Sequence, residues 1–200
     1  NKGFYLNMKK TKFIDPNIEN KSKTVEDNIQ LYMFNGQELP LPTEIEISES
    51  GTCNRTCSFC PRSAANFIDK KEFITNKLHE KLCIELKELN YKGTIRYSGF
   101  VEPMLDKNIF NLINMVRNYL PESNIEMVTN GDPLNLKRLK KLFESGLNKI
   151  LISAYDGKEE SDKLEDLCIQ ANLTEKQYIV RHRYYSEDQD FGITLSNRSG

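Results

Sequence analysis

The sequence alternates between short strands and amphipathic helices, and this alternation restricts the fold more than any other feature. Strand patterns occupy residues 43–48, 94–98, 125–129, 149–153 and 177–183. Apolar residues at helical spacing fall between them, at residues 75–89, 106–120, 135–145 and 159–171. The expected inward residues of the first helix are Leu78, Leu82, Leu86 and Leu89, and those of the third are Leu136, Leu139 and Phe143, with Gly146 as its stop. Alternating strands and helices form βαβ units, so the sequence predicts an α/β fold with parallel strands.

The expected closure of this sheet is a TIM-like β/α barrel or a part of one, because right-handed crossovers coil the sheet in one direction. An open doubly wound sheet is the competing architecture, although no glycine-rich phosphate motif follows the first strand. Only residues 184–190 separate the fifth strand from a further apolar segment at 191–195. A parallel crossover needs at least about 10–12 residues, so we expect a partial barrel.

The ends of the chain differ in character from the alternating region. Residues 1–42 are polar and are expected to form an N-terminal extension, with a solvated loop or arm before the first strand. Residues 43–200 then form the core domain. The chain does not begin with Met and stops at residues 197–200 without a closing helix or strand, so we expect a fragment of a longer protein.

Charge and hydropathy restrict the partners. The chain has 28 basic and 29 acidic residues, and this balance gives no attraction to nucleic acid or to a membrane surface. No apolar run approaches the roughly 20 residues of a membrane span, and the start of the chain lacks the apolar segment of a signal peptide. We therefore expect a soluble, cytoplasmic protein.

Three of the five cysteines lie close together, as Cys53, Cys57 and Cys60, in the spacing C-x-x-x-C-x-x-C. A disulfide framework would need pairing partners spread along the chain, so it does not explain an odd number of cysteines with three of them close together. Reduced thiols that bind a metal explain this arrangement better. A closed structural zinc site needs four ligands. Three thiolates suit a four-iron cluster that keeps one iron open. The other candidate ligands lie outside motif distance, and two of them, Cys83 and Cys168, are expected to be buried apolar residues.

The predicted carboxyl ends of the other strands carry polar and glycine-containing segments. These segments are residues 98–103, 129–131 and 153–157. Because ligands collect at the carboxyl ends of parallel strands, we expect all of them to face one site together with the cysteines.

The C-x-x-x-C-x-aromatic-C loop after the first strand resembles the cluster motif of the radical S-adenosylmethionine (SAM) enzymes, and the later motifs follow in order over about residues 43–200. The resemblance implies a partial (β/α)6 barrel with two cofactors, a 4Fe-4S cluster and SAM. Such enzymes cleave SAM reductively to a 5′-deoxyadenosyl radical, which abstracts a substrate hydrogen. The resemblance also implies a reductant such as flavodoxin or ferredoxin.

The resemblance further implies roles for individual residues. Cys53, Cys57 and Cys60 would each bind one iron, while SAM chelates the fourth. Phe59 would lie near the adenine, although packing within the loop is an alternative. The segment 98–103 resembles the Gly-Gly-Glu-Pro motif, so the Gly99 backbone and the Glu102 carboxylate would receive the SAM amino group.

Three further positions match SAM contacts of the family. Thr129 and Asn130 would lie near the ribose and sulfonium, with an ordinary Asn-Gly turn as the alternative. Ser153 would meet the carboxylate or ribose. Arg181 or Arg183 would pair with the SAM carboxylate, with a surface charge pair as the alternative. The resemblance identifies no catalytic residue, and His79 and His182 are weak candidates. We expect His79, in the first helix, to be solvated or partly packed.

Residues 192–200 resemble the tail that ends the barrel in members with a SPASM or twitch extension. That branch carries auxiliary iron–sulfur clusters, which would lie beyond Gly200. We therefore expect a peptide- or protein-modifying enzyme. A radical dehydrogenase or epimerase of a small carbohydrate is the alternative. A non-catalytic zinc or iron–sulfur module is the alternative from another class.

Overall fold

The computed structural model describes residues 29–184 of the chain. The predictions for residues 1–28 and for the segments 191–195 and 192–200 lie outside the described residues.

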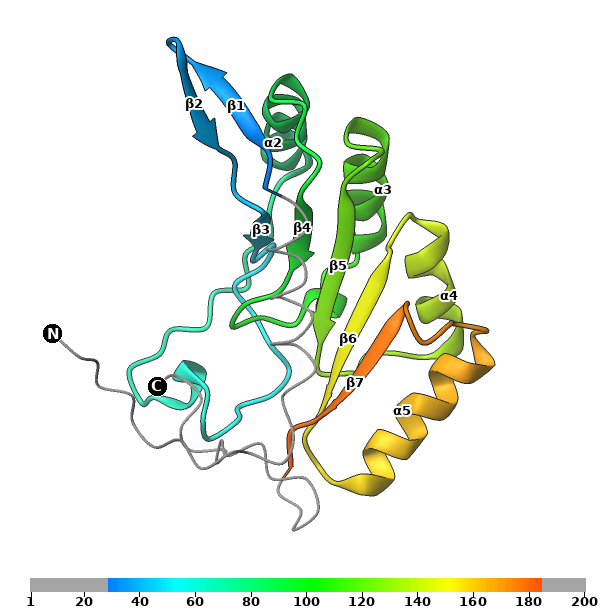
Figure 1. The fold of residues 1–200 in the computed structure, drawn as a ribbon. Coiled ribbons are helices and arrows are strands. Elements are labelled where there is room, and N and C mark those ends of the chain that lie inside the picture. Colours follow the sequence, from blue (N-terminus) through cyan, green and yellow to red (C-terminus); the bar gives the residue numbers. More distant parts are fainter. Residues whose placement is uncertain (1–28, 185–200) are drawn as a thin grey trace, which may run out of the picture.

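The centre of the fold is a five-stranded parallel sheet in which sequential strands are neighbours (Figure 1). Its strands, in spatial order, are β3 (Glu44–Ile47), β4 (Thr94–Tyr97), β5 (Asn124–Thr129), β6 (Lys149–Ala154) and β7 (Tyr178–His182). A doubly wound sheet would reverse its strand order at a switch point. The unreversed order is that of a barrel, and the predicted α/β fold with a partial barrel is confirmed.

Helices connect the strands and pack together along the outer side of the sheet (Figure 1). They are α2 (Asn76–Glu88), α3 (Ile109–Tyr119), α4 (Leu136–Glu144) and α5 (Lys158–Gln170), and the short 3-10 turns η1 (Pro61–Ser63) and η2 (Pro103–Leu105) lie in loops. Each of the four predicted helices is present within a few residues of its expected bounds. Thr75 and Asn135 cap α2 and α4 by accepting a backbone N–H.

Alternation along the strands divides the sheet into an apolar and a polar face. Ile95, Ile125, Met127 and Ile150 are fully buried in the core with the helices. The intervening residues include Arg96 and others that border a cavity on the opposite face. Side chains of a strand point alternately to its two faces, so the core and the cavity share the same strands.

The predicted inward face of α2 is confirmed at Leu86, which is buried, and in part at Leu82 and Leu89, which pack half-buried against the core, but it is wrong at Leu78. We expected Leu78 to face inward, but it is 58% exposed, and His79 and Cys83 are buried instead. The imidazole of His79 can be buried in the core because its Nε2 lies within hydrogen-bond distance, 2.8 Å, of the Tyr97 hydroxyl. Burial lowers the pKa of His79 to about 4. The expectation of a solvated or partly packed His79 is therefore also wrong.

The face of α4 differs from the prediction in a similar way. Leu139 is buried as expected, but Leu142 is the second buried residue, and Leu136 and Phe143 are only half-buried. Gly146 ends the α4 segment with φ +109, as predicted for a glycine stop.

A hairpin of two short strands, β1 (Leu31–Phe34) and β2 (Gln37–Pro40), precedes the sheet and was missed in the polar extension. Asn35 and Gly36 form its turn, with φ of 49° and 78°. An Asn-Gly pair favours such two-residue turns, so the signal was present in the sequence. In the described part of the chain, no helix combines the length and the hydropathy that crossing a membrane requires.

Candidate functional site

A cavity of about 470 Å³ opens among the carboxyl ends of the strands. All ten predicted cofactor contacts border this cavity. They are Cys53, Cys57, Phe59, Cys60, Gly99, Glu102, Thr129, Asn130, Ser153 and Arg181. The structure thus brings together every site residue expected from the sequence, although the role of each remains a prediction.

The loop that carries the three cysteines is fastened where it leaves and rejoins the fold. Ser50 forms an antiparallel bridge with Phe73, and the Gly51 N–H donates to Glu72 O at 2.9 Å. A Cβ on Gly51 would lie 2.3 Å from Lys70 O, so only glycine fits there. These contacts hold the cysteine loop over the end of β3.

The three thiols are half-buried and border the same cavity. Burial raises the pKa of Cys53, so a metal is needed to favour its thiolate. No set of three His, Cys, Asp or Glu side chains among residues 29–184 is gathered closely enough to hold a single metal ion. In a four-iron cluster each cysteine binds a different iron, and a soft thiolate set suits iron–sulfur chemistry. The donor set therefore fits the predicted cluster.

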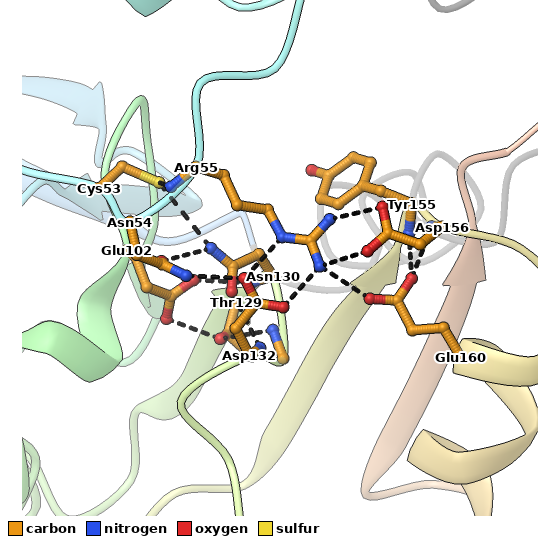
Figure 2. A network of polar contacts seen from close by, with 11 residues as sticks. Cys53, Asn54, Arg55, Glu102, Thr129, Asn130, Asp132, Tyr155, Asp156 and Glu160 are labelled. Atoms are coloured by element: carbon orange, nitrogen blue, oxygen red, sulfur yellow. Dashed lines mark hydrogen bonds and ion pairs between the residues drawn. The ribbon is translucent and has the colours of Figure 1, made fainter.

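Glu102 is almost fully buried and is held by hydrogen bonds from neutral donors (Figure 2). Its Oε1 accepts from Thr129 Oγ1 at 2.6 Å and from the Met104 N–H at 3.0 Å, and its Oε2 accepts from the Asn130 N–H at 2.7 Å. Burial raises the pKa of Glu102. A carboxylate oxygen can accept two hydrogen bonds, so Oε2 can still receive the amino group predicted for it.

Asn130 connects the end of β5 to the cysteine loop. Its Nδ2 donates to Asn54 Oδ1 at 2.8 Å and lies 3.8 Å from Cys53 Sγ, and its Oδ1 accepts from the Asp132 N–H. Gly131 follows with φ +84. The segment is therefore an Asn-Gly turn, as the alternative reading had it, and it also contacts the predicted cluster ligand.

Arg55, inside the cysteine loop, was not singled out from the sequence and joins three acidic side chains (Figure 2). Its Nε donates to Asp132 at 2.6 Å, its Nη1 to Asp156 at 3.0 Å and its Nη2 to Glu160 at 2.9 Å. Asp132 follows β5, Asp156 follows β6 and Glu160 lies in the first turn of α5, so one guanidinium ties the loop to two strand ends and to a helix. The hydrogen bonds to Arg55 lower the pKa of Asp132. The sequence held one signal for this contact: Asp132 and Asp156 come directly after predicted strands, and Arg55 is the one arginine inside the cysteine motif.

Arg62 fastens the opposite part of the cysteine loop. Its Nη1 donates to Gly51 O and Phe100 O, each at 3.1 Å, and its Nη2 contacts Asp69. The loop is thus bound to the segment after β4 as well as to β5 and β6.

The remaining predicted contacts lie on β6, β7 and the loop. Ser153 and Arg181 are paired in the β6–β7 register and both are buried. The alternative of a surface charge pair is therefore wrong for Arg181. The Phe59 ring lies 5.5 Å from the ring of Tyr155, so it borders the cavity and packs within the loop region at once.

Comparison with known proteins agrees with this geometry. Residues 47–186 match the model of the Radical SAM superfamily, and the chain belongs to this family. Members of the family are enzymes that use SAM and a 4Fe-4S cluster, so the predicted class and cofactors are confirmed.

Among curated proteins, the chain is similar to an S-adenosyl-L-methionine-dependent 2-deoxy-scyllo-inosamine dehydrogenase from Niallia circulans, with 31% identity over 78% of this chain and 59% of the relative. It is also similar to a GTP 3′,8-cyclase from Aquifex aeolicus, with 30% identity over 60% of this chain and 38% of the relative. The solved structure of BtrN in complex with AdoMet and 2-DOIA matches with a TM-score of 0.60 and 27% identity, covering 74% of this chain and 58% of that one. The chain therefore spans less than two thirds of the length of these relatives.

Proposed function

We propose that this protein cleaves SAM reductively at a 4Fe-4S cluster and abstracts a hydrogen atom from a small, hydroxyl-bearing carbohydrate, which it dehydrogenates. The observation that carries the proposal is the convergence of the three cysteines, Glu102 and the ends of β5 and β6 on one cavity. When bound, the cluster and SAM supply the radical chemistry, and the chain supplies binding, orientation and exclusion of water.

The roles of the residues follow from their positions. Cys53, Cys57 and Cys60 each hold one iron, and Glu102 accepts a hydrogen bond from the SAM amino group through the remaining capacity of Oε2. Arg181, buried beside Ser153, pairs with the SAM carboxylate. The network from Glu102 through Asn130 to Asn54 keeps the amino-group acceptor and the cluster loop in a fixed relation.

The choice of a carbohydrate substrate departs from the first expectation from the sequence. That expectation was modification of a peptide or protein, with a dehydrogenase of a small carbohydrate as the alternative. Similarity to the 2-deoxy-scyllo-inosamine dehydrogenase over 78% of the chain supports the alternative. A reductant such as flavodoxin or ferredoxin remains part of the proposal, because cleavage of SAM requires an electron.

The domain boundaries also belong to the proposal. Residues 43–200 would form the radical SAM core, and an auxiliary-cluster domain of the SPASM or twitch type would follow Gly200. The sequence of the gene beyond Gly200 tests this directly, since further grouped cysteines are expected there.

The activity is tested by anaerobic reconstitution of the full-length protein with iron and sulfide, followed by dithionite and SAM. Production of 5′-deoxyadenosine is expected, and its absence from a well-loaded sample would reject the proposal. Adding 2-deoxy-scyllo-inosamine should raise the rate of 5′-deoxyadenosine production and give a keto product. Cys57→Ala should abolish the cluster and activity together, whereas Cys83→Ala, in the core away from the cavity, serves as the matched control.

A further inference from the structure

The side chain of Asn130 contacts the sulfur of a predicted iron ligand. Its Nδ2 lies 3.8 Å from Cys53 Sγ, and because sulfur is larger than oxygen, this separation still allows an N–H···S hydrogen bond. Asn130 is 7% exposed, so bulk water hardly competes for its amide. The roles proposed above use Asn130 as a link between segments and leave its contact with the sulfur unexplained.

The surrounding hydrogen bonds fix which end of the Asn130 amide faces Cys53. The Asp132 N–H lies 3.0 Å from one end of the amide, and a backbone N–H can only donate, so that end is Oδ1. Nδ2 therefore points toward the cysteine loop (Figure 2). One of its two hydrogens is donated to Asn54 Oδ1 at 2.8 Å, and the second is left for Cys53 Sγ.

Further contacts hold Asn130 and its partner in this orientation. The Asn54 Nδ2 donates to the Asp132 carboxylate at 2.6 Å, which leaves Asn54 Oδ1 to face Asn130. The Asn130 backbone N–H donates to Glu102 Oε2 at 2.7 Å. The donor to Cys53 is thus positioned by bonds within the protein, as is usual for residues that surround the direct ligands of a metal site.

A second donor approaches the same sulfur. The Arg55 backbone N–H lies 3.4 Å from Cys53 Sγ and comes from the cysteine loop itself, whereas the Asn130 amide comes from the end of β5. An electron added to an iron–sulfur cluster increases the negative charge on its sulfur ligands, and N–H donors stabilise this charge. Hydrogen bonds to a ligand sulfur therefore raise the reduction potential of a cluster.

We infer that Asn130 is a positioning residue that raises the reduction potential of the cluster by donating a hydrogen bond to Cys53 Sγ. This role rests on the proposed function, because it takes Cys53 as an iron ligand. It differs from the contact with the SAM ribose and sulfonium predicted from the sequence, since both Nδ2 hydrogens are used within the protein. The hydrogen bond makes reduction of the cluster by its electron donor more favourable.

The hydrogen bond is tested by pulsed electron paramagnetic resonance on full-length protein that carries nitrogen-15 only in the side-chain amides of asparagine. The protein is loaded with the cluster and reduced with dithionite in the absence of SAM. A coupling between nitrogen-15 and the reduced cluster is expected in wild type and in Asn54→Leu, and it should be absent from Asn130→Leu. A wild-type cluster without this coupling, or a coupling that persists in Asn130→Leu, would overturn the inference.

Redox titration of the same three proteins tests the effect on the potential. Both variants lose the bond between the two asparagine side chains, but only Asn130→Leu loses the donor to Cys53, so Asn54→Leu is the matched control for a loosened loop. At a fixed potential, Asn130→Leu should lower the ratio of reduced to oxidised cluster about 3- to 10-fold, where tenfold corresponds to about 59 mV for a one-electron couple. Asn54→Leu should leave this ratio close to the wild-type value. Equal shifts in the two variants, or no shift in cluster-loaded Asn130→Leu, reject the inference.

A failure of the proposed function gives a different result. That failure is the absence of 5′-deoxyadenosine when SAM is added to the reduced, cluster-loaded protein, whereas the inference about Asn130 can fail in a protein that produces 5′-deoxyadenosine. If Asn130→Leu does not fold or does not bind the cluster, the nitrogen-15 spectra of wild type and Asn54→Leu decide, because both proteins keep the donor to Cys53.

Discussion

At the scale of single residues, the site depends on side chains that connect segments far apart in the sequence. Arg55 joins the cysteine loop to the ends of β5 and β6, and Asn130 joins β5 to the same loop. Neither residue is a predicted iron ligand. Such residues determine where the iron ligands lie. Without them the cysteine loop could adopt many conformations, and cluster binding alone would have to fix one of them.

Arg55→Gln should therefore weaken the cluster site without removing a ligand. The variant leaves Asp132 and Glu160 without their cation. We expect the free energy of unfolding to fall by about 1–3 kcal/mol, which lies between the costs of breaking an exposed and a buried ion pair. Iron content after reconstitution should fall severalfold, as measured by iron analysis and the charge-transfer absorbance. Lys92→Gln, which breaks the exposed pair with Glu122, is the control and should change neither quantity. Full iron loading in Arg55→Gln would contradict this role.

A second residue-scale prediction concerns Glu49, which is buried with both carboxylate oxygens unpartnered among the described residues. Burial raises its pKa to about 7. The folded state then binds more protons than the unfolded state between pH ~4.5 and ~7, so stability falls as pH rises through this window.

Glu49→Gln removes this titration. It should stabilise the protein at pH 8 by up to about 3 kcal/mol, because a shift of one pKa unit corresponds to about 1.4 kcal/mol. Little gain is expected at pH 4.5, where Glu49 is protonated in the folded state. Urea unfolding of both proteins at the two pH values measures the difference, and an equal effect at both pH values would argue against the titration.

At the scale of elements, the existence and order of the helices and strands could be predicted from the sequence. Which side chains of a helix are buried could not always be predicted. In α2, leucines at helical spacing pointed to Leu78, whereas the buried face contains His79 and Cys83. The sequence could not reveal this, because the partner that satisfies His79 is Tyr97 on a strand 18 residues away. Polar groups enter a core when a distant group pairs with them.

The register of α2 is tested by the same substitution at two positions. Leu86→Ala should cost about 2–5 kcal/mol, because Leu86 is buried in the core. Leu78→Ala should change stability by less than about 0.5 kcal/mol, as is usual for an exposed position. Comparable losses at both positions in chemical denaturation would mean that Leu78 also packs inward.

The turn after β4 allows another prediction at the same scale. Gly99 has φ +122, and a Cβ there would lie 2.2 Å from Ser48 Oγ. Gly157 has nearly the same φ, +120, but a Cβ on it would meet nothing within 4 Å. Gly99→Ala should therefore weaken SAM binding at least about tenfold, since it adds a clash to the backbone strain of a few kcal/mol.

Gly157→Ala supplies the matched control for this strain. It should lose stability without a comparable loss of SAM affinity, because no atom blocks the new methyl group. Calorimetric titration with SAM in the absence of reductant compares the two variants. Equal losses of affinity would mean that the strain, and not the clash with Ser48, limits binding.

At the scale of the whole molecule, the repeated βαβ order predicted the sheet and its polar rim, because the carboxyl ends of parallel strands must share one edge. The same rule gathered Cys53, Glu102, Asn130 and Ser153 before any geometry was known. The rule could not predict the links between these segments. Contacts such as that of Arg55 with Asp156 join residues 101 apart, and no local pattern encodes such pairs.

The hairpin of β1 and β2 shows the other limit of reasoning from periodicity. Its residues Leu31, Met33, Phe34 and Leu39 are exposed, so the hairpin lacks the buried face that gives a strand its clear alternation. Within residues 29–184, β1 and β2 pair with each other and form a sheet separate from the five-stranded one. A two-stranded hairpin without a packed face is marginally stable in water.

Hydrogen exchange should therefore separate the hairpin from the sheet. Amides of β1 and β2 should exchange at least about 100-fold faster than those of β5, because local opening of an unpacked hairpin needs far less free energy than opening of the central strand. Exchange followed by mass spectrometry on the full-length protein measures both elements at once. Similar protection of the two would mean that a surface outside the described residues covers the exposed apolar side chains of the hairpin.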